Sequence, residues 1–404
     1  MLKRLLSFSV VSLFISSVSF VFLPFITATL SLEEFATYSF YYTLCGMLTS
    51  VCCFGTIALL SIEVANDENR SSFESLDFLL SVNLIVNLSA VIILLLLGFR
   101  GYLILLPVLV FSRAVFLYIS HVYRVKGNLK EFALYNGLGY LLMFLVPLSL
   151  AYFIDLDGLE FLMLMGAVLL ISSSIGLVNL RLNEHFKFRF IFPHKSKEFK
   201  FCFFSAAHSL VASLVTMSDR FVLKALISDV DFAVYSLAAM LVGALSMVFS
   251  IVNQNIAPSL FKELTGDKNT KKVLVSFGKS YLLVILSLFG AFHMLIAPVL
   301  ELFFDEKYLG AINIVRMLSI GVLFQAMYFF GSNLVFFKKK SSEMFVMSAI
   351  CGVFGLLMSI VLFHSFAMEG VIIAFILTWF LFSGVTFYRA LKGLKSYVKN
   401  LQDN

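Results

Sequence analysis

A six-residue pattern occurs twice in this chain, at equivalent points of two long apolar stretches. Residues 35–40 read FATYSF, and residues 232–237 read FAVYSL, 197 positions later. Each copy follows an apolar run and a short acidic turn that begins at Ser31 or Ser228. Six residues alone could match by chance, but the shared context places the same membrane hairpin at the start of each half. The repeat predicts two like-oriented helical bundles around a central space, an arrangement more typical of carriers than of enzymes.

The composition places these bundles in a lipid bilayer. Hydrophobic residues make up 60% of the chain and charged residues only 13%, which is more apolar surface than a soluble domain could bury. The five cysteines lie in apolar segments without the spacing of metal ligands, so we expect neither a metal site nor a disulfide framework, and no cofactor. The basic residues lie in short loops, which argues against a nucleic-acid partner.

Twelve apolar stretches are long enough to cross about 30 Å of hydrocarbon. The first six lie near residues 7–30, 35–60, 76–97, 101–122, 132–154 and 159–180. The other six lie near residues 201–227, 232–257, 273–299, 310–336, 344–364 and 367–388. We therefore expect a first six-helix bundle at 1–180, a basic linker at 181–200, and a second bundle with a short tail at 201–404. The first stretch resembles a signal peptide, but it aligns with residues 205–227 and is interpreted as a retained span.

The basic residues also predict the orientation of the chain. Loops on the side of the N-terminus contain 23 of them, whereas the opposite loops contain only Arg100 and Lys307. The excess places both termini in the cytoplasm. The predicted fold is an all-α polytopic membrane protein of about 12 transmembrane helices, in two six-helix bundles related by a pseudo-two-fold axis along the membrane normal.

Three segments resemble a known family. Residues 218–237 (SDRFVLKALISDVDFAVYSL) are similar to the family's seventh span and the turn that follows it. Residues 123–130 resemble the basic loop after the family's fourth span. Residues 369–374 resemble the Gly-rich entry to the family's last span. The chain is identified as a member of the multidrug/oligosaccharidyl-lipid/polysaccharide exporter superfamily. It most resembles the Wzx-type flippases of O-antigen and related polysaccharide units. Ala36 and Ala233 stand where a glycine is common in that family.

The resemblance implies a function and partners. Such proteins move an undecaprenyl-diphosphate-linked glycan from the cytoplasmic to the periplasmic leaflet of the bacterial inner membrane by alternating access. Membrane lipid and other polysaccharide assembly proteins are the further partners it implies. A small-molecule exporter of the same superfamily, or a flippase for another lipid-linked precursor, is the alternative within transport.

Arg113 is the intramembrane charge that is hardest to explain structurally. It lies about twelve residues into a span of roughly 22, where a charge costs about 2.5–3.5 kcal/mol on insertion scales. A cavity-facing role and a structural ion pair are both open at this point. Aligning the basic loops after spans four and ten, at an offset near 212, places Gln325 at the equivalent depth of the second half.

Other intramembrane charges lie near span ends. Arg220 and Lys224 follow each other on one helix face, beside Asp219, and either line a cavity or reach the outer headgroups. Arg316 either lines a cavity or lies at a helix interface, and the sequence does not decide between the two. Lys279 is interpreted as a headgroup anchor. Five cations and one acid favour an anionic cargo, because arginine can bind phosphate oxygens bidentately. The substrate-binding candidates are thus Arg113, Asp219, Arg220, Lys224, Arg316 and Gln325.

An enzyme is the alternative from another class. Two Asp-x-Asp sequences, at 155–157 and 229–231, could hold a metal or act as acid and base in a polysaccharide polymerase. Each lies in a turn of a few residues, where aspartates commonly cap helices. The loops on that side are too short to shape a sugar site, so we predict no catalytic residue.

Overall fold

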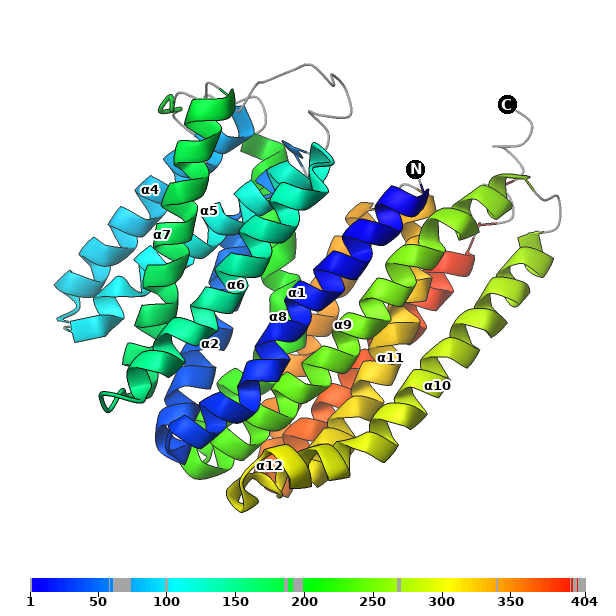
Figure 1. The fold of residues 1–404 in the computed structure, drawn as a ribbon. Helices are drawn as coiled ribbons and strands as arrows, with labels where there is room; N and C mark the ends of the chain where they lie inside the picture. Colours follow the sequence, from blue (N-terminus) through cyan, green and yellow to red (C-terminus); the bar gives the residue numbers. More distant parts are fainter. Residues whose placement is uncertain are drawn as a thin grey trace. The chain divides into compact units, whose positions relative to one another are not determined.

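The chain forms two compact units, Met1–Ser213 and Leu214–Asn404, in a computed structural model. The structure describes residues 2–57, 59–60, 74–98, 101–184, 188–191, 199–266, 270–338, 341–392, 394 and 398. Within these residues there are helices and no strands, so the predicted all-helical architecture is confirmed (Figure 1). The boundary between the units falls inside the helix that follows the predicted linker.

The helices follow the twelve apolar stretches closely. In the first part of the chain they are α1 (Leu2–Thr29), α2 (Leu32–Cys52), α4 (Glu74–Leu96), the 3-10 helix η1 (Gly101–Leu105), α5 (Leu106–Val125), α6 (Leu129–Ala151) and α7 (Gly158–Glu184). They continue as α8 (Phe199–Leu226), α9 (Asp229–Gly266), α10 (Thr270–Phe303), the 3-10 helix η3 (Glu306–Tyr308), α11 (Ala311–Phe337) and α12 (Ser341–Leu391).

The helix α12 is a hairpin of two helices. Ala367 adopts φ 49° and ψ −134°, which breaks the helix where the sequence predicts the boundary between the last two spans. A Cβ on Gly370 would lie 2.1 Å from the Leu362 carbonyl oxygen, and one on Gly355 would lie 2.9 Å from Thr378 Oγ1. These close approaches pair residues on either side of Ala367, so the two arms run antiparallel. The described residues thus contain twelve long helices.

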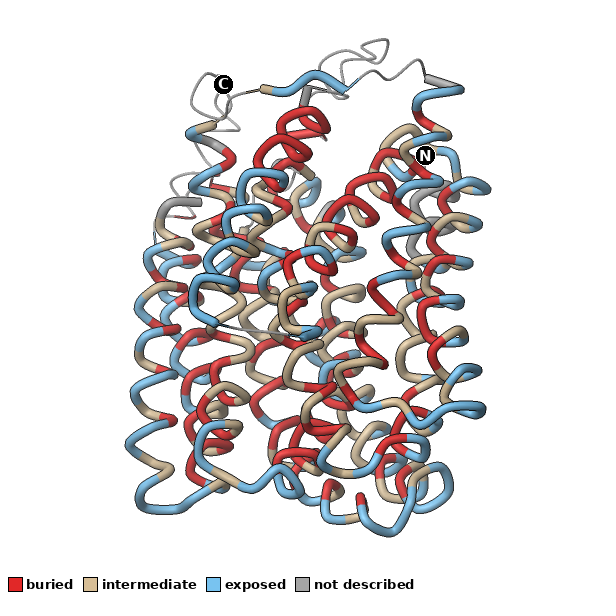
Figure 2. Tube along the Cα trace, turned by 90° about the vertical axis from the view of Figure 1, so that its left-hand side faces the viewer, coloured by how far each residue is buried: buried red, intermediate tan, exposed pale blue. Residues whose placement is uncertain are grey.

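Nine helical segments of the described chain are long and apolar enough to span a membrane, and the segment Glu343–Leu391 is one of them although it contains both arms of α12. The two long helices below this threshold are α2, which is rich in Tyr, Thr and Ser, and α8, which contains Asp219, Arg220 and Lys224. Most other helices expose large apolar side chains, such as Leu283 at 68% and Met294 at 80% in α10. Figure 2 shows buried and exposed residues alternating along the helices. Exposed apolar faces of this kind are the ones that contact hydrocarbon.

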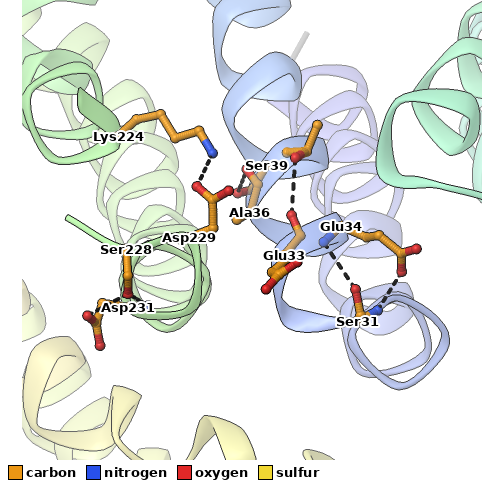
Figure 3. Close-up of polar contacts among 10 residues, drawn as sticks. Ser31, Glu33, Glu34, Ala36, Ser39, Lys224, Ser228, Asp229 and Asp231 are labelled. Carbon is orange, nitrogen blue, oxygen red and sulfur yellow. Dashed lines mark hydrogen bonds and ion pairs between the residues drawn. The ribbon is translucent and has the colours of Figure 1, made fainter. Parts of the chain in front are cut away.

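The sequence repeat corresponds to a repeated local structure (Figure 3). Ser31 caps α2: its Oγ accepts a hydrogen bond from the Glu34 amide (3.2 Å), and the Glu34 carboxylate accepts one from the Ser31 amide (2.8 Å). Ser228 caps α9 similarly, because its Oγ accepts from the Asp231 amide (3.1 Å) and donates to the Asp231 carboxylate (2.7 Å). Such caps satisfy amides that lack partners in the first helical turn.

The residues after each cap are buried to the same extent in both copies. Phe35, Ala36, Phe232 and Ala233 are fully buried, as are their neighbouring tyrosines Tyr38 and Tyr235. Alanine in place of glycine therefore still allows close packing here. The prediction that each half begins with the same hairpin is confirmed for this local structure.

The two halves also share internal helix contacts. In the first unit, α5 contacts α2, α4 and α7, and α2 contacts α4. In the second unit, α11 contacts α9, α10 and α12, and α9 contacts α10. If α2 is aligned with α9, α4 with α10, α5 with α11 and α7 with the second arm of α12, each of these helix contacts in the first unit has a counterpart in the second. A Cβ on Gly321 of α11 would lie 2.5 Å from the Phe375 ring, in the second arm of α12, which is the counterpart of α7.

The end of α11 is tied to the end of α12. The ammonium of Lys338 is buried and donates to the backbone carbonyls of Arg389 (2.5 Å) and Lys392 (2.9 Å). Carbonyls at a helix C-terminus lack intrahelical partners and carry partial negative charge, so a cation is favourable there. Lys338 thus closes the C-terminal end of this helix pair.

The predicted linker at 181–200 is partly helical. Residues up to Glu184 belong to α7, and α8 begins at Phe199. Between them, residues 188–191 lie against α4: the Arg189 amide donates to the Asp77 carboxylate (2.9 Å) and the Ile191 amide to Ser81 Oγ (3.0 Å). Residues 185–187 and 192–198 of the predicted linker, together with the basic residues Arg70, Arg100, Lys339 and Lys340, lie outside the described residues.

Candidate functional site

Arg113 lies at the centre of its span. The candidate span Gly101–Val125 extends twelve residues to either side, which corresponds to about 18 Å of helix in each direction. A side chain at that depth cannot reach the headgroups. The residues beside it, Ser112 and Ala114, are fully buried, whereas Arg113 itself is only partly buried.

The guanidinium of Arg113 faces α2 of the same unit. Its Cζ lies 5.1 Å from the centre of the Tyr42 ring. A Cβ on Gly46, one turn further along α2, would lie 3.9 Å from Nη1, an ordinary contact distance, so the guanidinium lies beside this turn of α2. The Tyr38 ring stacks on the Tyr42 ring, with 5.6 Å between their centres. The sequence between residues 38 and 42 thus provides an aromatic lining for this charge.

No carboxylate in the described part of the chain forms an ion pair with Arg113. A cation–π contact contributes about 0.5–2 kcal/mol, which is less than the ~2.5–3.5 kcal/mol cost of a charge at the helix centre. The sequence allowed Arg113 to be part of a structural ion pair, and within the described residues this pair is not formed. The arginine retains a free positive charge that an anion can neutralise.

Gln325 occupies the corresponding helix pair of the second unit. It is buried on α11, and its Oε1 accepts a hydrogen bond from Ser246 of α9 (2.5 Å). Arg113 on α5 likewise faces α2, the counterpart of α9. The two aligned polar positions therefore face equivalent helices, although only one of them carries a charge.

Asp219 and Arg220 both contact α9. The Asp219 carboxylate is buried and accepts a hydrogen bond from the Tyr235 hydroxyl, while its Oδ1 has no partner. Arg220 Nη2 donates to the Ala239 carbonyl at 3.4 Å. The aligned position in the first unit is Phe22, so Tyr38, the counterpart of Tyr235, has no acid beside it and packs edge-on against Phe161.

Lys224 has a local partner. Its Nζ lies 2.5 Å from the Asp229 carboxylate and 5.4 Å from the centre of the Phe232 ring, at the turn between α8 and α9 (Figure 3). Lys224 thus pairs with an acid of the next helix and not with Asp219, whose carboxylate accepts from Tyr235 instead. Arg316 is exposed on α11, and its carbonyl accepts a hydrogen bond from Ser319 (2.8 Å). Lys279 is exposed on α10, and its role as a headgroup anchor stays a prediction.

The candidates therefore form separate groups. Asp219, Arg220 and Lys224 lie together on the last turns of α8, and Gln325 lies nine residues from Arg316 on α11. Arg113 belongs to the other unit.

A buried asparagine pair was not identified from the sequence. Asn333 Nδ2 of α11 donates to Asn253 Oδ1 of α9 at 2.7 Å, and both side chains are buried. Unsatisfied amides are costly in an apolar environment, so such a pair stabilises one packing of the two helices. The available signal was an asparagine near the end of each apolar stretch, 80 residues apart.

The Asp-x-Asp sequences have structural roles. Asp157 caps α7, because its Oδ1 accepts hydrogen bonds from the amides of Leu159 (2.8 Å) and Glu160 (2.7 Å). Asp229 pairs with Lys224, and Asp231 completes the cap of α9. Among the described residues, His, Cys, Asp and Glu side chains form no group of three that could hold a metal ion.

Comparison with known proteins places the chain in a family. Residues 1–264 match the family described as polysaccharide biosynthesis protein. No curated protein matches the sequence.

Among solved structures, a multidrug resistance MATE family transporter of the MOP superfamily is similar in its inward-facing conformation (TM-score 0.72, 13% identity, 95% of each chain). The outward-facing conformation of such a transporter is also similar (TM-score 0.66, 16% identity, 98% of this chain and 96% of that one). A third similar structure is a MOP superfamily transporter from Pyrococcus furiosus, described as having a binding pocket of reverse polarity (TM-score 0.62, 14% identity, 98% of this chain and 96% of that one). These likenesses confirm the predicted all-helical fold.

Proposed function

Because this chain belongs to the polysaccharide biosynthesis protein family, we propose that it is a flippase for an undecaprenyl-diphosphate-linked oligosaccharide. The cargo is an O-antigen or related polysaccharide repeat unit, which moves from the cytoplasmic to the periplasmic leaflet by alternating access. Other polysaccharide assembly proteins are the partners that would supply and use it. The observation that carries the proposal is Arg113, a mid-membrane cation that has an aromatic lining and no carboxylate partner among the described residues.

The chemistry of a diphosphate fits this arginine. A guanidinium donates two parallel hydrogen bonds to phosphate oxygens, and the interaction is strong where water is scarce. The Tyr42 ring beneath the guanidinium holds it in place without neutralising it. A cationic drug would be repelled by the same group.

The function can be tested in a strain that lacks the gene. We expect deletion to abolish surface polysaccharide while the lipid-linked unit accumulates on the cytoplasmic side. The measurements are surface polysaccharide by immunoblot and lipid-linked glycan by extraction and mass spectrometry, with a plasmid-borne copy as the control. Normal polysaccharide in a deletion strain without a redundant flippase would contradict the proposal.

A small-molecule exporter is the second candidate, favoured by the fold shared with multidrug transporters. In that case deletion would raise sensitivity to drugs and leave the lipid-linked glycan unchanged. The same strain therefore separates the two functions.

The proposal includes an orientation, with both termini in the cytoplasm of a bacterial inner-membrane protein. It is supported by the 23 basic residues in loops on the side of the N-terminus against two on the other side. Reporter fusions after residues 190, 265 and 340 should be cytoplasmic, and fusions near 156 and 230 periplasmic. A periplasmic signal at 190 would contradict both the orientation and the division into six and six helices.

A further inference from the structure

The first unit contains an apolar slot that the proposed cargo site does not use. It has a volume of about 600 Å³ and lies between α4, α5, α7 and residues 188–191. Its lining includes Leu80, Leu84, Phe111, Val178, Phe188 and Arg181. The volume is within the range of small-molecule sites, and Arg181 is the charged residue of the lining.

The register of α5 and α7 gives the length of the slot. A Cβ on Gly166 would lie 2.9 Å from Leu109, and one on Gly176 would lie 3.0 Å from Ile119. The two helices are therefore parallel, with an offset of 57 residues, which places Arg181 level with Arg124. Phe111 is thirteen positions before Arg124, or about 20 Å along the helix. The slot thus extends from the middle of the membrane to the end of α7.

The slot is open to the surroundings along its side. Leu84, Val178 and Phe188 of its lining are exposed by 43%, 55% and 48%. At membrane depth the surrounding medium is hydrocarbon, so a long apolar slot that opens sideways is accessible to a lipid chain. A soluble ligand would have to enter through that hydrocarbon.

Positive charge lies at one end of the slot. Arg181 is exposed in the last turn of α7 and forms no ion pair with a described residue. The Asp77 carboxylate accepts a hydrogen bond from the Arg189 amide, which holds residues 188–191, with the lining residue Phe188, against α4. In the proposed orientation this end lies at the cytoplasmic headgroups, where anionic lipids attract basic side chains.

We propose that the slot holds one acyl chain of an anionic phospholipid of the cytoplasmic leaflet, with its phosphate on Arg181. The placement in that leaflet depends on the proposed orientation, whereas binding itself does not depend on the proposed function. A bulk phospholipid is far more abundant than a carrier lipid, so mass action fills a laterally open slot with it. The bound lipid fastens residues 188–191 to α4 and α7.

The test uses full-length protein purified in detergent, with lipid binding followed by native mass spectrometry. We expect phosphatidylglycerol to bind about tenfold more tightly than phosphatidylcholine, because a charge-assisted contact to phosphate is added to the same acyl contacts. Arg181→Gln should bind phosphatidylglycerol only as tightly as phosphatidylcholine, because the acyl contacts remain and the phosphate contact is lost. Arg124→Gln, at the same level on α5, is the matched control and should keep the preference.

A second variant tests the slot itself. Leu84→Trp fills it and should weaken the binding of both lipids about tenfold, while Leu88→Trp, one turn along α4 and 55% exposed, should change neither. Thermal unfolding of each variant shows whether it is folded. An unchanged preference in Arg181→Gln, or unchanged binding in folded Leu84→Trp, would overturn the proposal. Displacement of phosphatidylglycerol by equimolar undecaprenyl phosphate would also overturn it and assign the slot to the carrier's tail.

Discussion

Replacing Arg113 by alanine is expected to abolish most polysaccharide export while the protein still accumulates in the membrane. The arginine is at the centre of its span and forms no ion pair within the described residues, so its removal leaves no buried acid unpaired. Removing the charge also removes an insertion cost of about 2.5–3.5 kcal/mol. Folding should therefore tolerate the change, whereas binding of a diphosphate should not.

Two further variants identify what the arginine does. Arg113→Lys keeps the charge but loses the planar group that stacks on Tyr42 and grips two phosphate oxygens, so it should restore export only in part. Lys279→Ala removes an exposed cation of α10 and should be nearly silent. Protein level and polysaccharide output are measured side by side for each variant.

Either of two results would refute the assignment of Arg113. Failure of Arg113→Ala to accumulate would mean that the residue is structural. Normal accumulation with normal export would remove the main support for an anionic cargo and favour a small-molecule exporter.

Gly158→Ala is expected to reduce the amount of folded protein several-fold. Gly158 is the first residue of α7, where a Cβ would lie 2.0 Å from the Glu34 carbonyl oxygen and 3.0 Å from the Tyr38 amide nitrogen. Both atoms belong to the backbone of α2, so they cannot move aside as a flexible side chain would. Overpacking of a close contact costs about 1–3 kcal/mol or more, and such losses change steady-state abundance severalfold.

A matched control is available on α6. A Cβ on Gly137 would have no neighbour within 4 Å, so Gly137→Ala should leave the level unchanged or raise it, because alanine favours helix by about 1 kcal/mol. Membrane abundance and thermal unfolding in detergent provide the comparison. Equal levels of the two variants would show that α7 is not held against α2 at Gly158.

Local sequence patterns predicted much of the fold. The caps at Ser31 and Ser228 and the break near Ala367 were predictable because each depends on residues close together in the chain. The depth of Arg113 was predictable too, since it follows from the length of the apolar stretch around it.

The surroundings of these residues were not predictable, because they depend on which helices pack together. Nothing in the sequence near Arg113 indicates that Tyr42 lies over its guanidinium, 71 residues earlier. The contact of Arg189 with Asp77 joins positions 112 residues apart, and the Asn253–Asn333 pair joins positions 80 apart. By contrast, the pairing of Lys224 with Asp229 joins positions only five apart in the sequence.

The bonds of Lys338 to the carbonyls of Arg389 and Lys392 have a mechanical consequence for transport. They fasten α11 and the second arm of α12 at one end, and separating the two helices there would cost two charge-assisted hydrogen bonds of a buried side chain. In the proposed alternating access, these two helices would therefore move together as one rigid unit. Bending must occur elsewhere, as hinges do in domain motions that leave packed pairs intact.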